Sequence, residues 1–322
     1  MVWLEFSGLS LLIILFGWQL AKKADFLAEK KQWGKGIVGF VLLGFATSLP
    51  ELVTTLSSVI HVHNADLGAG NILGSNFANF FILFMSLMFA KTLRRKGLLD
   101  LESISSIGMF LLILGVYGFA ALYHGNPRPL GISLWGIIMI ALFFVSIAVL
   151  HKTDSGIEPE EKGKKEDYKY LWLYIQLAFM LVVLVATSWQ ISIVVNEIAK
   201  VTGWNSTSVG ALFLAWATSF PELVVTVSAV AIGAAEMGIG NITGSIIFNM
   251  MVLGVADLFA KTGESLFVLN NKTTQLLLFL IINAAVLLIL LTRASLPRLL
   301  RISVWSVIMM IFYTVGMLLL FS

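Results

Sequence analysis

Ten apolar stretches dominate the chain, and each is about as long as a helix that crosses a lipid bilayer. Such a helix needs roughly 20 consecutive apolar residues. Only 12% of the 322 residues are charged, about half the fraction typical of a soluble domain. A water-soluble fold of this size could not bury so much apolar surface, so a soluble enzyme is excluded. The stretches lie at residues 3–21, 35–61, 67–90, 103–123, 129–150, 171–199, 205–233, 237–260, 273–292 and 301–321.

One polar segment divides these stretches into two sets of five. Residues 152–170 carry eleven charged side chains, a composition typical of a solvated linker. The sequence therefore predicts an all-α polytopic membrane protein with ten transmembrane helices. Its predicted parts are a first unit at 1–151, the linker at 152–170 and a second unit at 171–322.

The positions of lysine and arginine predict how the chain is oriented. With ten spans, seventeen of the 21 basic residues fall on one side and four on the other. Basic loops stay in the cytoplasm, so we expect both termini outside a plasma or inner membrane and the linker in the cytoplasm. The net charge of +3 gives no indication of nucleic-acid binding. The absence of cysteine excludes disulfides and cysteine-ligated zinc.

Two short sequences recur at one spacing in the two units. Residues 46–53 read ATSLPELV and residues 217–224 read ATSFPELV, while GNILGSNFAN at 70–79 returns as GNITGSIIFN at 240–249. The repeated regions extend over 44–80 and 215–250. Because each unit has an odd number of spans, the two copies should lie inverted in the bilayer. Secondary transporters use this plan, with the substrate site near the midplane where the repeats meet.

Each repeat places one glutamate near the middle of an apolar stretch. Burying the carboxylate of Glu51 or Glu222 in a bilayer costs at least about 2.5–3.5 kcal/mol, and no lysine or arginine lies mid-stretch to neutralise it. A bound cation or shared protons must compensate. The alternative is a structural, protonated glutamate. Pro50 and Pro221 precede the two glutamates and should interrupt the helices by removing a backbone hydrogen bond.

Hydroxyl and amide groups recur around the glutamates at helical spacing. An all-oxygen site with two negative charges suits Ca²⁺, hydroxyl and carbonyl oxygens suit Na⁺, and the lack of His and Cys argues against Zn²⁺ or Cu⁺. Single serines or asparagines in membrane helices otherwise join neighbouring helices, but here their duplication favours a site. The candidate ligands are Glu51, Glu222, Thr47, Thr218, Ser48, Ser219, Ser75, Ser245, Asn79 and Asn249.

The same blocks contain glycine pairs and two further asparagines. The G-x-x-x-G pairs let helices approach closely, so we expect them to pack and to position the ligands. The asparagines should cap helices or form hydrogen bonds near their starts. These residues are Gly70, Gly74, Gly240, Gly244, Asn71 and Asn241.

The doubled motifs resemble the sodium/calcium exchanger family of the cation/calcium antiporter superfamily. Its two alpha repeats carry G-T-S-x-P-E and G-N-x-x-G-S-x-x-x-N/D. The resemblance implies ten helices in two inverted repeats, with Glu51 and Glu222 as central carboxylates. It also implies that Thr47 and Thr218 lend backbone oxygen to Ca²⁺, and that Asn79 and Asn249 close the central site. It places Na⁺ around Ser48, Ser219, Ser75 and Ser245, with backbone oxygen from Gly44 and Ala215.

Three departures from the family pattern bear on mechanism. Ala46 and Ala217 replace the glycine usual before Thr-Ser. Asn249 stands where several relatives have Asp, which leaves two formal negative charges at the site. The linker is too short for the calcium-sensing domains of animal exchangers.

The sequence therefore predicts a secondary antiporter, not an enzyme, that exchanges Ca²⁺ for Na⁺ by alternating access and needs no cofactor. Exchange of Ca²⁺ against H⁺, or of another divalent cation such as Mg²⁺, remains open on the same fold. A cation channel is the alternative of another class, although no filter loop is recognisable. A membrane enzyme is weaker still, because no catalytic motif occurs.

Overall fold

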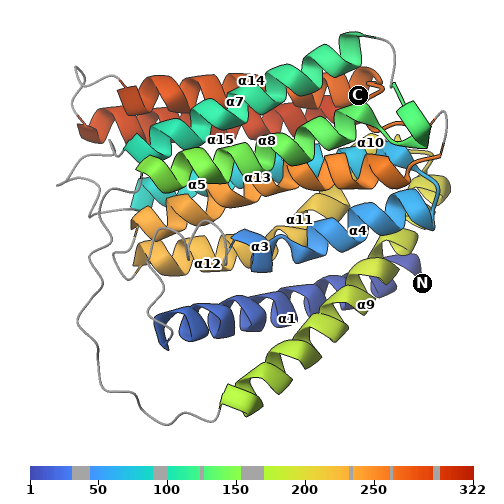
Figure 1. Ribbon diagram of the computed structural model, residues 1–322, viewed down its shortest axis with the longest axis horizontal. Coiled ribbons are helices and arrows are strands. Elements are labelled where there is room, and N and C mark those ends of the chain that lie inside the picture. Colours follow the sequence, from blue (N-terminus) through green and yellow to red (C-terminus); the bar gives the residue numbers. More distant parts are fainter. Residues whose placement is uncertain are drawn as a thin grey trace.

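The computed structural model describes residues 1–30, 44–89, 101–123, 127–153, 170–231, 235–261, 264–292 and 298–322. Within these ranges the chain is helical and contains no strand (Figure 1). Each of the ten predicted stretches holds helix. Most of the predicted linker, residues 154–169, and the start of the second stretch, residues 35–43, lie outside the described residues.

Eight helices are long and continuous. Seven of them are long and apolar enough to cross a membrane, and a bent helix in the second unit makes an eighth candidate span, counting described residues only. The other two predicted stretches hold an apolar helix at 49–60 and the apolar part, residues 134–150, of the eighth long helix. The long helices are α1 (Val2–Lys30), α5 (Ala65–Phe89), α7 (Leu101–Leu122), α8 (Leu134–Thr153), α9 (Tyr170–Thr202), α13 (Ala235–Phe259), α14 (Asn271–Thr292) and α15 (Arg298–Phe321).

The remaining helices are short pieces that adjoin the two repeated motifs. They belong to two interrupted helices, one in each unit. Separately, a 3₁₀ turn lies in the connection before α8. The first unit has α3 (Gly44–Thr47) and α4 (Leu49–Ile60). The second has α10 (Ser206–Val209), the π-helical turn η3 (Gly210–Leu214), α11 (Ala215–Thr218) and α12 (Phe220–Ala231), and the 3₁₀ turn is η2 (Pro129–Gly131).

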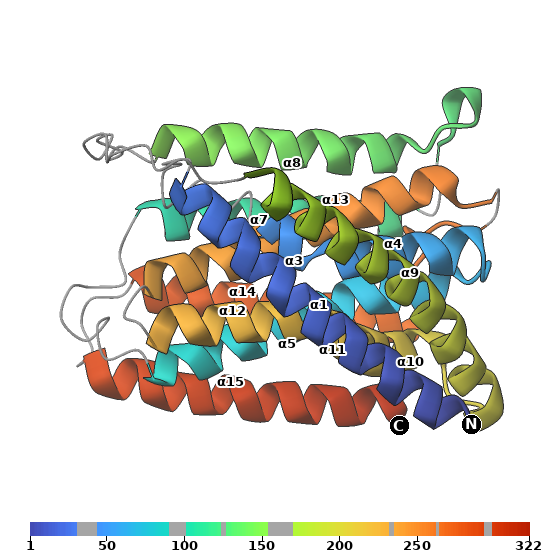
Figure 2. The same ribbon diagram turned by 90° about the horizontal axis from the view of Figure 1, so that it is seen from below.

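Helices α5 and α13 form the centre of the bundle. In α5, 94% of the candidate span is buried, and in α13, 78%. In contrast, α1 has 11% of its span buried. It packs against α9 on one face of the molecule (Figure 2), where α1 also contacts α12 and α9 contacts α4. The exposed sides of α1 and α9 carry large apolar residues such as Leu11, Trp172 and Phe179. These surfaces suit contact with lipid, whereas the polar motifs lie on buried helices.

Glycine explains how closely α5 approaches the second unit. A Cβ atom added to Gly70 would collide with the backbone of Thr207, and one added to Gly74 would collide with the backbone of Ala211. The packing predicted for this pair is confirmed. At Gly240, the counterpart of Gly70, an added Cβ would meet nothing within 4 Å, so the packing role expected there is not supported.

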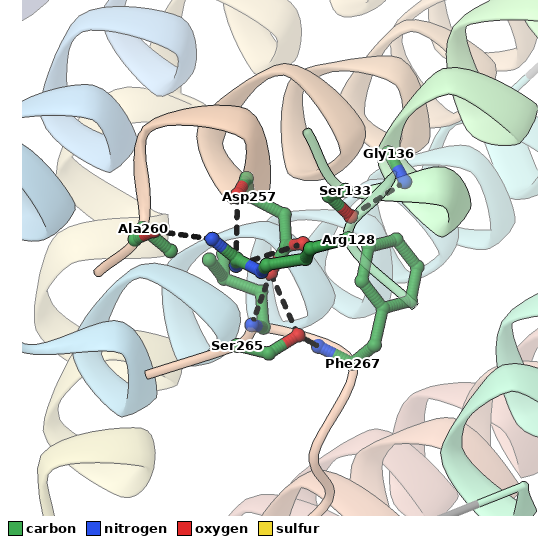
Figure 3. A network of polar contacts seen from close by, with 8 residues as sticks. Arg128, Ser133, Gly136, Asp257, Ala260, Ser265 and Phe267 are labelled. Carbon is green, nitrogen blue, oxygen red and sulfur yellow. Dashed lines mark hydrogen bonds and ion pairs between the residues drawn. The ribbon is translucent and has the colours of Figure 1, made fainter. Parts of the chain in front are cut away.

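A polar network fixes the connection before α8 to the end of α13 (Figure 3). The Arg128 guanidinium donates to the carbonyl oxygens of Ala260 and Asp257 at 2.7 and 3.2 Å, and it lies 3.5 Å from the Asp257 carboxylate. The other oxygen of that carboxylate accepts from Ser265 Oγ at 2.8 Å and from the Leu266 N–H at 2.7 Å. Asp257 is fully buried, so these partners compensate for its lost hydration.

Candidate functional site

Both repeated motifs interrupt a helix at the same serine. Ser48 separates α3 from α4 with φ −90° and ψ 8°, and Ser219 separates α11 from α12 with φ −85° and ψ 7°. Pro50 and Pro221 follow two residues later and lack the N–H that a regular helix needs. The second helix bends by 48° at this point. The predicted proline interruptions are therefore confirmed, with nearly equal geometry in the two units.

Each interruption places a serine hydroxyl against the carboxylate of the other unit. Ser48 Oγ donates to Glu222 Oε1 at 2.9 Å, and Ser219 Oγ donates to Glu51 Oε1 at 2.9 Å. All four residues are completely buried. The two copies of the motif thus form one reciprocal cluster, in which each half of the chain helps to hold the carboxylate of the other.

The second oxygen of each carboxylate is left without a partner. Glu51 Oε2 and Glu222 Oε2 are buried and accept no hydrogen bond, and within the described ranges neither carboxylate forms an ion pair. A buried, uncompensated carboxylate is strongly unfavourable. A cation at these two oxygens would supply the missing compensation, because Ca²⁺ and Na⁺ both bind carboxylate oxygens.

Helices α5 and α13 add a second layer of oxygen donors. Ser245 Oγ donates to Glu222 Oε1 at 3.4 Å and lies 3.5 Å from Thr47 Oγ1. One helical turn further along, Asn249 Oδ1 is buried without a partner. In α5, Ser75 Oγ and both side-chain polar atoms of Asn79 are likewise buried and unpartnered. The four predicted ligands on α5 and α13 are thus buried, and all but Ser245 have an oxygen that makes no hydrogen bond within the protein.

Most of the remaining predicted residues form hydrogen bonds within their own helices, and Thr47 Oγ1 also donates to Asn241 Oδ1 of the other unit at 3.4 Å. The Gly44 carbonyl accepts from the Ser48 N–H at 3.1 Å and from Thr47 Oγ1 at 3.4 Å. The Ala215 carbonyl accepts from the Ser219 N–H at 2.9 Å and from Thr218 Oγ1 at 3.2 Å. Gly44 and Ala215 therefore lie beside the cluster, but in this conformation each of their carbonyl oxygens already accepts a helical hydrogen bond.

The two buried asparagines at the starts of the second motif brace the glutamate-bearing helices. Asn71 donates to Thr54 Oγ1 at 2.9 Å and to Thr55 Oγ1 at 2.8 Å, which ties α5 to α4. Asn241 donates to Thr226 Oγ1 at 3.2 Å and so ties α13 to α12. Their predicted hydrogen-bonding role is confirmed.

Sequence reasoning missed one residue of this region, Asn76. It is completely buried, and it joins α5 to α13 through Ile246 and Asn249. Its repeat counterpart is Ile246, so the search for duplicated polar residues could not find it. The one feature of the sequence that could have indicated Asn76 is that it directly follows Ser75, a candidate ligand.

In the part of the chain that the structure describes, no three or more His, Cys, Asp or Glu side chains lie together in a group that could hold a metal ion. Two carboxylates with hydroxyl and amide oxygens are instead the donor set of a site for hard cations. The helix interruptions and the buried position at the centre of the bundle are the features of a membrane cation transporter.

The chain belongs to the sodium/calcium exchanger protein family, which it matches over residues 2–152 and 171–322. It is an integral membrane protein of a transporter family and not an enzyme. The inner membrane protein YrbG of Escherichia coli K12 is 27% identical over 226 residues, which cover 67% of this chain and 67% of that protein. The sodium/calcium exchanger MaX1 of Methanosarcina acetivorans is 44% identical over 62 residues, which cover 19% of this chain and 18% of that protein.

The fold is similar to a solved exchanger structure over nearly its whole length. The sodium-calcium exchanger NCX_Mj, soaked with Na⁺ and Sr²⁺, aligns over 99% of both chains with a TM-score of 0.66. The sequence identity is 19%, so this likeness establishes the fold alone. The predicted all-α exchanger fold is confirmed.

Proposed function

We propose that this protein is a secondary antiporter that exchanges Ca²⁺ for Na⁺ at the cluster around Glu51 and Glu222. One observation carries the proposal: two buried carboxylates each have one oxygen held by a serine of the other half and one oxygen with no partner. A pair of negative charges in this setting needs one divalent or two monovalent cations. The same carboxylate oxygens would bind either one Ca²⁺ or two Na⁺, so occupancy by Ca²⁺ excludes occupancy by Na⁺.

The chemistry of the surrounding donors supports these ions over others. Hydroxyl, amide and carboxylate oxygens are hard ligands, which Ca²⁺ binds in sets of six to eight. Candidate ligands are Ser75, Ser245, Asn79 and Asn249 beside the glutamates, with Ser48 and Ser219 orienting the carboxylates and Thr47 and Thr218 at the helix interruptions. Gly44 and Ala215 would contribute only if their carbonyls exchange a helical hydrogen bond for an ion.

We further propose alternating access between two inverted units. Each unit supplies one glutamate and the serine that holds the opposite one, so the site lies where the two repeats meet. We propose that units 1–151 and 171–322 are inverted repeats, with both termini outside the membrane and the segment between them in the cytoplasm. Neutralising the carboxylates lowers the free energy of carrying the site through the bilayer, which couples movement to ion loading.

The test is Ca²⁺ flux in proteoliposomes. Vesicles loaded with Na⁺ and diluted into Na⁺-free medium should take up ⁴⁵Ca²⁺. Glu51→Gln and Glu222→Gln should each lower the initial rate at least about 100-fold, because losing one buried charged partner typically changes a free energy by 3–5 kcal/mol.

Glu197→Gln is the matched control. Glu197 is an exposed α9 carboxylate paired with Lys200 at 2.6 Å, so its loss should leave the rate unchanged. Near-normal flux in both site variants would contradict the proposal. Uptake driven by a pH gradient without Na⁺ would replace Na⁺ by H⁺ as the coupling ion.

A further inference from the structure

The Asn76 side chain bridges the two central helices. Its Nδ2 donates to the backbone carbonyl of Ile246 at 3.2 Å, and its Oδ1 accepts from Asn249 Nδ2 at 2.9 Å. Asn76 and Asn249 are both fully buried. Water therefore does not compete for these bonds, and the protein groups alone decide how the two amides are oriented.

The backbone carbonyl of Ile246 fixes the orientation of both amides. A carbonyl oxygen can only accept, so Asn76 must turn its NH₂ group toward it. The Asn76 oxygen then faces Asn249, which can satisfy it only with its own NH₂ group. The oxygen of Asn249 must point away from Asn76, and it is the buried oxygen without a partner.

The Asn249 side chain lies on the same face of α13 as Ser245, which is part of the candidate site. Asn249 follows Ser245 by four residues, a spacing that puts both on one side of a helix. Ser245 Oγ donates to Glu222 Oε1 at 3.4 Å. The Asn249 oxygen is therefore held one turn from the contact between α13 and the Glu222 carboxylate.

The amide of Asn79, the counterpart of Asn249 in the first half of the chain, is not held by hydrogen bonds of this kind. The repeat counterpart of Asn76 is Ile246, which has no amide, and both Nδ2 and Oδ1 of Asn79 are unpartnered. The site is thus asymmetric: the orientation of the Asn249 amide is fixed by the protein and that of Asn79 is not.

We propose that Asn76 is a positioning residue that fixes the carbonyl oxygen of Asn249 toward the transported cation and requires an amide, not a carboxylate, at position 249. This inference rests on the proposed cation site. With a carboxylate at position 249, a carboxylate oxygen would face Asn76 Oδ1, and neither can donate a hydrogen bond. Flipping the Asn76 amide would not help, because its Oδ1 would then face the Ile246 carbonyl oxygen. The site is thereby restricted to two negative charges, which one divalent or two monovalent cations neutralise.

Asn76→Leu tests the positioning role through the kinetics of ⁴⁵Ca²⁺ uptake. The apparent KM for Ca²⁺ should rise about tenfold, the upper end of what one hydrogen bond between uncharged groups contributes, with the maximal rate little changed. In the Asn249→Ala background the same substitution should change KM less than about twofold, because no oxygen remains to be positioned.

Asn283→Leu is the matched control. Asn283 is a buried amide whose hydrogen bond, to the Phe279 carbonyl at 2.7 Å, stays within α14 and involves neither α5 nor α13. Its loss should leave KM for Ca²⁺ unchanged. A wild-type KM in Asn76→Leu, or an effect that adds fully to that of Asn249→Ala, would overturn the inference.

A second measurement separates this inference from the proposed function. At about pH 8, where an ordinary Asp is ionised, Asn249→Asp should lower the melting temperature of the ion-free protein. It should do so by less than half as much in the Asn76→Leu background, because the facing acceptor is gone. Equal losses in the two backgrounds would overturn the role of Asn76, whereas a stable wild type without Na⁺-driven Ca²⁺ uptake would contradict only the proposed function.

Discussion

At the residue scale, the central feature is a pair of hydrogen bonds exchanged between the halves of the chain. Ser48 holds Glu222 and Ser219 holds Glu51. Each bond fixes one carboxylate oxygen and leaves the other available to a cation. The arrangement also makes the two halves depend on each other, because separating them removes the donor from both buried carboxylates.

A double-mutant cycle should detect this dependence. Ser48→Ala and Glu222→Gln each remove one side of the same bond, so their effects on stability should be non-additive, with a coupling of about 0.6–1.7 kcal/mol, as found for polar contacts between membrane helices. The melting temperature of the purified protein in detergent measures it. Pairing Ser48→Ala with Glu197→Gln should give additive effects, and additivity in both cycles would contradict the contact.

At the element scale, the first glycine of the second motif is tightly packed in one copy and not in the other. Helix α5 lies directly against the backbone at Thr207 and Ala211, whereas α13 has open space at Gly240. The glycines therefore look alike in the sequence but have different structural roles.

Alanine substitution should reveal the difference. Gly70→Ala should destabilise the protein by about 1–3 kcal/mol, the usual effect of overpacking, because the added methyl group meets rigid backbone. Gly240→Ala should leave stability unchanged or raise it slightly. Thermal unfolding in detergent compares the two, and equal losses would show that the packing is symmetric after all.

The network at the end of α13 should affect stability without affecting ion affinity. Asp257→Leu would leave the Arg128 guanidinium without its carboxylate and remove the acceptor for Ser265 and Leu266. We expect a loss of about 3–5 kcal/mol, as for other broken buried pairs, with the KM for Ca²⁺ unchanged in the folded fraction. A changed KM would show that this network communicates with the cation site.

At the scale of the whole molecule, the described helices form one bundle around α5 and α13. Both termini lie at the same end of this bundle (Figures 1 and 2), as expected for an even number of crossings. The distribution of basic residues predicts that this end faces outward. The absence of cysteine makes the orientation directly measurable, since any cysteine that is introduced is the only one.

Single-cysteine labelling tests the orientation. Ser322→Cys should react with a membrane-impermeant maleimide added to intact cells, whereas Gly163→Cys should react only after the cells are opened. The opposite pattern would invert the predicted topology. Labelling of both positions in intact cells would indicate a different number of crossings.

Much of this architecture could be predicted from the sequence because its polar motifs are duplicated. The doubled Thr-Ser-x-Pro-Glu and Gly-Ser motifs located the interrupted helices and the buried polar residues. They could not show which serine holds which glutamate, since that depends on how two distant segments meet. Asn76 could not be found in this way, because its counterpart in the other repeat is not polar. Hydropathy did not indicate that Asp257 pairs with Arg128, which lies 129 positions away in the sequence.

Competition between Ca²⁺ and Na⁺ for one site formed by Glu51 and Glu222 is the basis of the proposed exchange. Equilibrium binding of ⁴⁵Ca²⁺ to the purified protein, measured as the Na⁺ concentration rises, tests it most directly. We predict that Na⁺ displaces all bound Ca²⁺ competitively and that Glu51→Gln and Glu222→Gln each abolish Ca²⁺ binding. Ca²⁺ that stays bound at saturating Na⁺, or in either variant, would show that the two cations do not share a site at these glutamates.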